Sequence, residues 1–220
     1  MQFFQKTNNF LKHPVPATSL AVYRMLFSLL VLISTIRFLA LGWVGDQYIQ
    51  TQFHFKYFGF EWVPHLNSPY IYIPFILLII ASIGVFLGLF YRISSVLLFL
   101  SFTYIELLDI SYYLNHYYFV SLTSLVLIFV PANHCFSLDI KWRRLKPYSH
   151  IPQYQIFVFK ILLALVYVYA GIAKINYDWL FNAMPLKIWL KAQYDMPVFG
   201  SLFRYDITAY IFSWMGMIYD

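Results

Sequence analysis

The amino-acid sequence predicts an all-α protein, a polytopic transmembrane helix bundle with about five spans and the start of a sixth. The first observation is composition: of 220 residues, 61% are hydrophobic and only 11% are charged. A soluble domain carries about a quarter charged residues, so this balance indicates a membrane protein. The second observation is that apolar stretches of about 20 residues, long enough to cross a bilayer as helices, recur along the chain. The third is the presence of 20 tyrosines and six tryptophans, which suit an extensive membrane–water interface.

Each predicted span rests on one uncharged or nearly uncharged stretch. Thr18 and Ser19 are expected to cap the first helix. In the second, Gly84 and Gly88 form a small-xxx-small pair that permits close helix contact. Pro152 is expected in the first turn of the fifth helix, a position that proline suits. The spans cover residues 20–41, 70–90, 93–112, 117–133 and 152 to about 174.

A sixth apolar run, residues 207–219, has 13 residues and is too short to cross a bilayer. We therefore expect the chain, residues 1–220, to be one transmembrane domain and the front part of a longer protein.

The connection between the first two spans, residues 42–67, is rich in aromatic side chains. We favour a segment that lies on the bilayer surface, because such segments bury aromatic rings at the headgroup level. The alternative is a lid over a functional site. The aromatic side chains are Trp43, Phe53, Phe55, Tyr57, Phe58, Phe60 and Trp62.

Lysine and arginine counts predict the orientation in the membrane. With five spans, one side holds seven basic residues and the other side holds only Arg37 and Lys56 before the fifth helix ends. Basic loops stay in the cytoplasm, so the N-terminus is expected there. If the protein is bacterial, we expect it in the inner membrane. The net charge of +6 is explained by these loops, so we expect the lipid bilayer as a partner and no nucleic acid. The seven are Lys6, Lys12, Arg92, Lys141, Arg143, Arg144 and Lys146.

This topology gathers polar groups at the non-cytoplasmic end of the bundle. Glu106 and Asp109 are three residues apart and are expected on one helix face. The group consists of Glu106, Asp109, Asn115, His116 and Lys174.

A second Asn-His pair, Asn133–His134, lies 18 residues after the first. That separation corresponds to about 27 Å of helix, which places the second pair at the cytoplasmic end, where capping is the expected role. The single cysteine, Cys135, excludes an internal disulfide and a cysteine-based metal site.

Lys174 ends an apolar run, since residues 161–173 carry no charge. Two interpretations follow. A lysine at a helix end commonly snorkels to the headgroups. Alternatively, apolar surroundings favour the neutral amine, and a neutral amine is a base.

The chain resembles the transmembrane part of the vitamin K-dependent gamma-glutamyl carboxylase family, also called the horizontally transferred transmembrane (HTTM) domain. The matching segments occur in family order over nearly the whole chain. They are residues 19–27 (SLAVYRMLF), 58–62 (FGFEW), 115–118 (NHYY), 131–134 (PANH), 137–139 (SLD) and 170–179 (AGIAKINYDW).

The resemblance implies a catalytic site. The family's base lysine corresponds to Lys174, which favours the second interpretation of that residue. The histidine of the family's Asn-His pair corresponds to His116, preceded by Asn115, and is held to assist proton abstraction or to stabilise the resulting anion. Animal enzymes have two adjacent lysines, whereas this chain has Ala173 before Lys174.

The implied activity is that of a carbon–carbon lyase of the peptidyl-glutamate 4-carboxylase type. A neutral lysine deprotonates vitamin K hydroquinone or a menaquinol-type quinol, and reaction with O2 produces a stronger base. That base removes a γ-proton from glutamate in a protein substrate, and CO2 adds to the carbanion while the quinone epoxide forms. No metal is implied.

Two other functions stay open from the sequence. One is a quinone- or lipid-modifying membrane enzyme on the same scaffold, without protein carboxylation. The other is a non-enzymatic channel or transporter, which would need polar residues at mid-span, and the second and fourth predicted spans offer no charged residue.

The orientation is testable through Cys135, the only thiol in the chain. A membrane-impermeant maleimide should not label Cys135 in intact cells, because the topology places it on the cytoplasmic side. Asn67→Cys in a Cys135→Ser background should be labelled. The reverse pattern would overturn the predicted topology.

Overall fold

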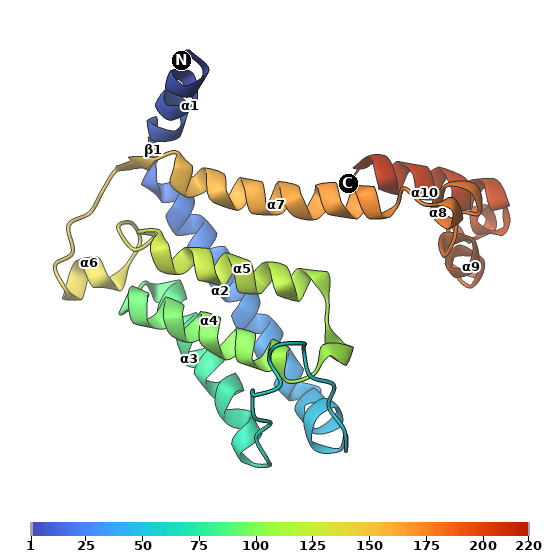
Figure 1. The fold of residues 1–220 in the computed structure, drawn as a ribbon, viewed down its shortest axis with the longest axis horizontal. Helices are drawn as coiled ribbons and strands as arrows, with labels where there is room; N and C mark the ends of the chain where they lie inside the picture. The colour runs from blue at the N-terminus through green and yellow to red at the C-terminus, as the bar shows by residue number, and fades with distance from the viewer. Residues whose placement is uncertain (1, 220) are drawn as a thin grey trace. The chain divides into compact units, whose positions relative to one another are not determined.

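A computed structural model describes residues 2–219, and for Gln2 and Phe3 it describes the backbone alone. The fold is all-α, as predicted, with one very short sheet (Figure 1). The chain forms two compact units, Met1–Phe159 and Lys160–Asp220, and helix α7 (Tyr154–Ala173) crosses the boundary between them. The family resemblance extends across both units.

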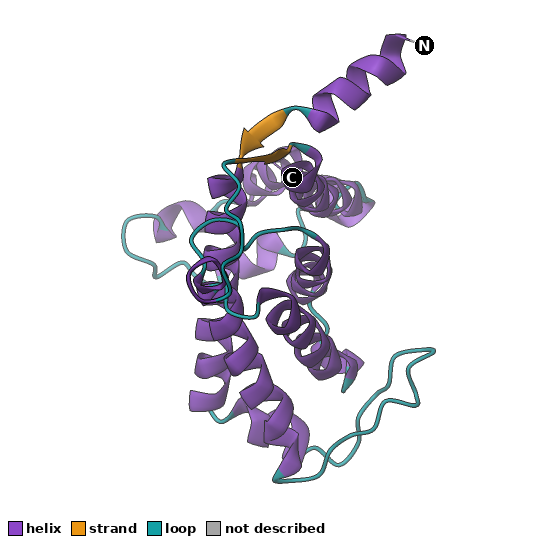
Figure 2. Ribbon diagram, turned by 90° about the vertical axis from the view of Figure 1, so that its left-hand side faces the viewer, coloured by secondary structure: helices purple, strands orange, loops and turns teal. Residues whose placement is uncertain are grey.

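Four helices form the body of the first unit: α2 (Ala17–Ala40), α3 (Ile73–Leu87), α4 (Tyr91–Leu107) and α5 (Asn115–Phe129). Consecutive helices pack on one another, α2 on α3, α3 on α4 and α4 on α5 (Figures 1 and 2). Their contact faces form a continuous apolar core that includes Leu20, Phe75, Val85, Leu98 and Leu127.

Close packing between α3 and α4 depends on Gly84. A Cβ atom at this position would collide with the side chain of Ser94 on α4, so the predicted role of Gly84 in helix contact is confirmed. Gly88 has a different role, because it ends α3 in the left-handed region with φ of 61°. Glycine adopts this conformation without steric cost, which explains the sharp reversal into α4.

Within the described residues, three helical segments are long and apolar enough to cross a membrane: Ala17–Ala40, Tyr70–Leu87 and Tyr154–Ala173. The second includes the short helix η2 (Tyr70–Tyr72). Helices of this length and hydropathy indicate a membrane protein.

The other two predicted spans form shorter helices, of 17 residues in α4 and 15 in α5. Helix α4 ends at Leu107, before Asp109. Helix α5 ends at Phe129 because Val130 precedes Pro131 and is extended, with ψ of 145°.

The sheet joins two distant parts of the first unit. Strand β1 (Pro14–Pro16) follows α1 (Gln2–Lys12) and pairs antiparallel with β2 (His150–Pro152). Pro152 therefore belongs to a strand, and α7 begins two residues later. The prediction that Pro152 lies in the first turn of the fifth helix is wrong for this reason.

The start of α2 also differs from the prediction. The helix begins at Ala17, so Thr18 and Ser19 lie inside its first turn and do not cap it. The Ala17 amide instead donates to the Ser149 carbonyl, at 3.0 Å, beside the sheet.

A buried polar cluster ties α2 to the α3–α4 turn and to α6 (Leu138–Trp142). Arg24 is fully buried and donates from Nη2 to the Phe136 carbonyl at 2.6 Å. The buried carboxylate of Asp139 accepts from the Phe90 amide at 2.9 Å and from the Tyr91 amide at 3.1 Å. Asn133 also donates to Asp139, at 2.9 Å, so its side chain organises this cluster rather than capping α5.

His134 folds the adjacent loop in a similar way. Its ring stacks on Tyr148 with centroids 4.2 Å apart, and its Nδ1 lies 2.6 Å from the Lys146 carbonyl. The second Asn-His pair therefore has a structural role, as the sequence predicted, although by loop folding and not by capping.

The second unit contains the later part of α7, then α8 (Tyr177–Phe181), α9 (Leu186–Lys191), η4 (Gly200–Arg204) and α10 (Asp206–Tyr219). Tyr210 and Trp214 on α10 donate to carbonyls at the end of α8, at 2.8 and 2.9 Å. The apolar run at 207–219 is therefore a helix that packs on α8.

The buried cluster predicts that Asp139→Asn destabilises the protein by about 3 kcal/mol, because a neutral amide accepts weakly from the two backbone amides and no longer offsets the charge of Arg24. Asp46→Asn, at an exposed position, is the matched control. Equilibrium unfolding in mixed micelles measures both variants. Equal stabilities would contradict the central role of this carboxylate.

Candidate functional site

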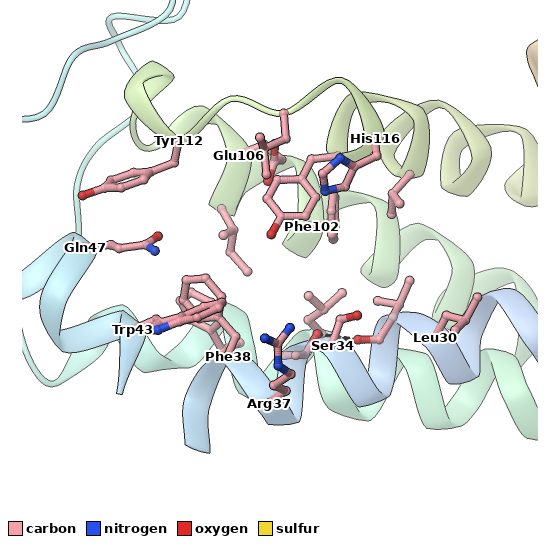
Figure 3. A pocket seen from close by; sticks show the side chains of 18 of the residues that line it. Leu30, Ser34, Arg37, Phe38, Trp43, Gln47, Phe102, Glu106, Tyr112 and His116 are labelled. Carbon is pink, nitrogen blue, oxygen red and sulfur yellow. Dashed lines mark hydrogen bonds between the residues drawn. The ribbon is translucent and has the colours of Figure 1, made fainter. Parts of the chain in front are cut away.

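A cavity of about 560 Å³ lies in the first unit, between α2, α4, α5 and the segment that follows α2 (Figure 3). Its volume is within the range of small-molecule sites. Most of its wall is apolar or aromatic, including Phe27, Leu30, Phe38, Phe102 and Val120.

Polar groups gather toward one end of the cavity. Along α2 the lining runs from Phe27 to Arg37, a distance of about 15 Å at 1.5 Å per residue. Leu30 lies toward the apolar end, and Gln47 and Tyr112 lie at the other end (Figure 3). The cavity can therefore hold an amphiphile, with a polar ring at one end and an apolar chain at the other.

His116 lines the cavity from the first turn of α5. Leu114 is extended and ends the preceding connection, so Asn115 and His116 begin the helix, whereas the sequence placed them before it. The His116 ring packs edge-on against Tyr117, with centroids 4.6 Å apart. Asn115 is exposed and is outside the cavity lining.

Glu106 and Asp109 line the same cavity, although they do not share a helix face. Asp109 lies beyond the end of α4, where its Oδ1 accepts from the Ser111 amide at 2.9 Å and so caps η3 (Ile110–Tyr112). Of the predicted polar group, the structure therefore brings Glu106, Asp109 and His116 to one cavity. Asn115 lies outside its lining, and Lys174 belongs to the second unit.

Asp109 is held by His54, a residue that was not predicted from the sequence as part of the site. His54 Nδ1 lies 3.1 Å from Asp109 Oδ2, and both side chains are largely buried. Burial raises the pKa of Asp109, but the hydrogen bonds from Ser111 and His54 outweigh it, and the net shift is downward. Asp109 is therefore an ionised acceptor near neutral pH.

His54 stacks on His65, with ring centroids 4.1 Å apart and nearly parallel planes. Burial lowers the pKa of His65, and the neighbouring His54 and Lys56 lower it further. The Ile110 amide donates to the Phe55 carbonyl at 2.9 Å, which fastens this loop to η3. Two histidines within an aromatic loop were the signal in the sequence that could have indicated this contact.

The aromatic segment 42–67 contributes to the cavity and also exposes large side chains. Gln47 and Tyr48, in and around η1 (Gly45–Ile49), form part of the wall. Phe53, Phe58 and Trp62 are exposed. The segment therefore covers part of the cavity, as a lid would, and exposes aromatic rings, as a segment on the bilayer surface would.

Arg37 points into the cavity from the last turn of α2, on the wall opposite His116 and Glu106 (Figure 3). Its guanidinium lies over the ring of Trp43, 5.2 Å from the centroid. In the sequence, Arg37 stands out only as a basic residue that helps to set orientation.

Lys174 lies in the second unit, one residue after the end of α7. Its Nζ is 3.5 Å from the Gly216 carbonyl on α10 and 5.5 Å from the centroid of the Trp179 ring. The lysine is partly buried between these groups.

The spacing from Lys174 to Trp179 follows from a tight turn. Asn176 donates to the Ala173 carbonyl and accepts from the Trp179 amide, both at 2.9 Å, so its side chain joins the end of α7 to the start of α8. Trp179 is fixed in turn by Ser213, through reciprocal hydrogen bonds of 2.7 and 2.8 Å. The segment from Lys174 to Trp179 thus places the lysine amine over an indole ring that is held by hydrogen bonds.

The fold and the cavity define an α-helical membrane protein with a largely apolar cavity between its helices. Comparison with protein families identifies it further, since the HTTM domain matches residues 12–220. The chain belongs to the HTTM domain family. No solved structure matches the chain.

The contacts of Asp109 predict a pH-dependent stability. Asp109→Asn should lower the free energy of unfolding by about 1–2 kcal/mol at pH 7, because the charged acceptor of Ser111 and His54 is lost. Because the pKa of Asp109 is lowered in the folded protein, its ionised carboxylate stabilises the fold at pH values above the ordinary pKa of a carboxyl group. This stabilisation is lost as the pH falls through the pKa of Asp109 in the folded protein.

The difference between wild type and Asp109→Asn should therefore shrink as the pH falls below about 4. Unfolding in micelles at neutral and acidic pH measures it, with exposed Glu61→Gln as the control. A difference that stays constant with pH would contradict the assignment of Asp109 as ionised.

Proposed function

We propose that this protein is an integral membrane enzyme of the vitamin K-dependent gamma-glutamyl carboxylase type. It couples oxidation of a membrane-soluble quinol to its epoxide with carboxylation of glutamate in a protein substrate, using O2 and CO2. The N-terminus is cytoplasmic and the site faces the other side. The observation that carries the proposal is the amphiphile-sized cavity with His116 in its polar wall, within a chain of the HTTM domain family.

The cavity residues suit a quinol by their chemistry. Aromatic and aliphatic side chains would surround the ring and its apolar chain, as membrane-soluble ligands require. His116 and Glu106 can exchange hydrogen bonds or protons with ring oxygens. When bound, the quinol supplies the reducing electrons and the strong base, and the protein supplies binding, orientation and a dry site.

The surroundings of Lys174 support its role as a base. Its amine contacts the ring of Trp179 and the Gly216 carbonyl on α10. The turn closed by Asn176 fixes the lysine relative to Trp179. In this proposal, Lys174 is the base that deprotonates the quinol.

A two-part assay on the purified protein tests the function. Epoxide formation from vitamin K hydroquinone under O2 separates a quinol-oxidising enzyme from a channel or transporter. Addition of a glutamyl peptide and labelled bicarbonate separates a carboxylase from an enzyme that modifies only the quinone or lipid. The proposal would be refuted if the protein formed neither the epoxide nor the labelled peptide.

Lys174→Arg should give folded, membrane-inserted protein with little turnover. Arginine retains the charge and the long stem but does not release its proton near neutral pH. Lys174→Ala should also be inactive, and a small exogenous amine should partly restore it by occupying the vacated space. Full epoxidation by Lys174→Arg would assign Lys174 to interface anchoring instead.

His116→Ala should reduce epoxidation by about 100-fold, the scale expected when a positioned acid–base group is removed. His150→Ala is the matched control, because His150 is exposed in β2 and outside the cavity. Within the described residues, its ring forms a hydrogen bond only with Ser149. Equal losses in the two variants would show that the effect does not come from the cavity.

A further inference from the structure

Arg37 has donors that the fold does not use. Within residues 2–219 the structure gives its guanidinium no ion pair and no hydrogen bond, although the side chain points into the cavity. The donors of a guanidinium lie in its plane. The contact with Trp43 is a cation–π contact, with Cζ of Arg37 5.2 Å from the ring centroid, and it uses none of these N–H donors in a hydrogen bond.

The carboxylates of the cavity do not neutralise Arg37. Asp109 is engaged by His54 and by the Ser111 amide. Glu106 lines the opposite wall and does not form an ion pair with Arg37 (Figure 3). The cavity therefore presents a fixed cation on one wall, and groups able to accept or donate a proton, Glu106 and His116, on the other.

We propose that Arg37 binds the ionised oxygen of a ring-bearing amphiphile, so that the cavity selects the anionic form of its ligand over the neutral form. A charge-assisted hydrogen bond from a guanidinium to an anionic oxygen is about twice as strong as a neutral one.

This inference rests on the proposed function, since a quinol is the ligand in question. A quinol must lose a proton before it can react with O2 in that function. A guanidinium beside the ring oxygen favours the deprotonated quinol, and so makes removal of that proton easier. Arg37 would then determine which protonation state of the quinol the site holds.

Two inert probes test the proposal by binding alone. The first is a 2-hydroxy-3-alkyl-1,4-naphthoquinone, which is ionised at neutral pH. The second is the 2-methyl-3-alkyl-1,4-naphthoquinone with the same alkyl chain, which is neutral. Dissociation constants are measured in one detergent at one pH by quenching of tryptophan fluorescence, because Trp43 is part of the cavity wall.

Wild type should bind the anionic probe about tenfold more tightly than the neutral probe. Arg37→Gln should lose this preference and retain its affinity for the neutral probe, which also shows that its cavity is intact. Arg37→Lys should keep part of the preference, since it keeps the charge but not the planar fork. Arg92→Gln, which removes an exposed arginine outside the cavity lining, should behave as wild type.

Equal affinity of wild type for the two probes would overturn the inference, and this result needs no variant to fold. An undiminished preference in Arg37→Gln would overturn it as well. The proposed reaction is judged separately by epoxide formation. If wild type discriminates between the probes but forms no epoxide, the role of Arg37 in binding would stand and the proposed reaction would be refuted.

Discussion

The first unit depends on the requirement that a buried charge be compensated. Arg24 lies fully buried in an apolar helix, where an uncompensated cation is costly. Compensation comes from the Phe136 carbonyl and from the nearby Asp139, and Asp139 in turn holds the first amides of the α3–α4 turn. Gly88 leaves room for Arg24 at that point, since a Cβ atom there would collide with the guanidinium. One polar cluster therefore sets the mutual positions of α2, α3, α4 and α6, and the cavity lies between the helices that it positions.

Much of the fold could be predicted from the sequence because apolar runs and spanning helices have the same cause. Without water, backbone groups must be satisfied within the helix, so hydropathy alone locates the segments. The ends were less predictable, because they are set by tertiary contacts. The pairing of β1 with β2 places Pro152 in a strand. Asp109 lies beyond the end of α4, where its side chain accepts a hydrogen bond from the Ser111 amide. The paired strands lie far apart in the sequence, Pro14 opposite Pro152, so no local pattern displays their contact.

The site was partly predictable for a related reason. Counting spans and charges placed Glu106, Asp109 and His116 at one end, and the structure brings these three into one cavity. Arg37 and His54 were not predicted as site residues, since their importance comes from a cavity wall and from a contact across 55 positions of sequence. A lone arginine near a helix end and a histidine in an aromatic loop both have ordinary explanations at an interface. Only three-dimensional contacts distinguish them from such residues.

The short sheet has a consequence for the order of events during synthesis. Strand β1 emerges early, but its partner is made only after all four packed helices of the first unit. Chains grow at about 5–20 residues per second, so β1 stays unpaired for several seconds while α2 to α5 are produced. The pairing therefore acts as a closing step that joins the beginning of the first unit to the entry of α7. A polypeptide released before residue 152 would carry the helices of the cavity but not this closure.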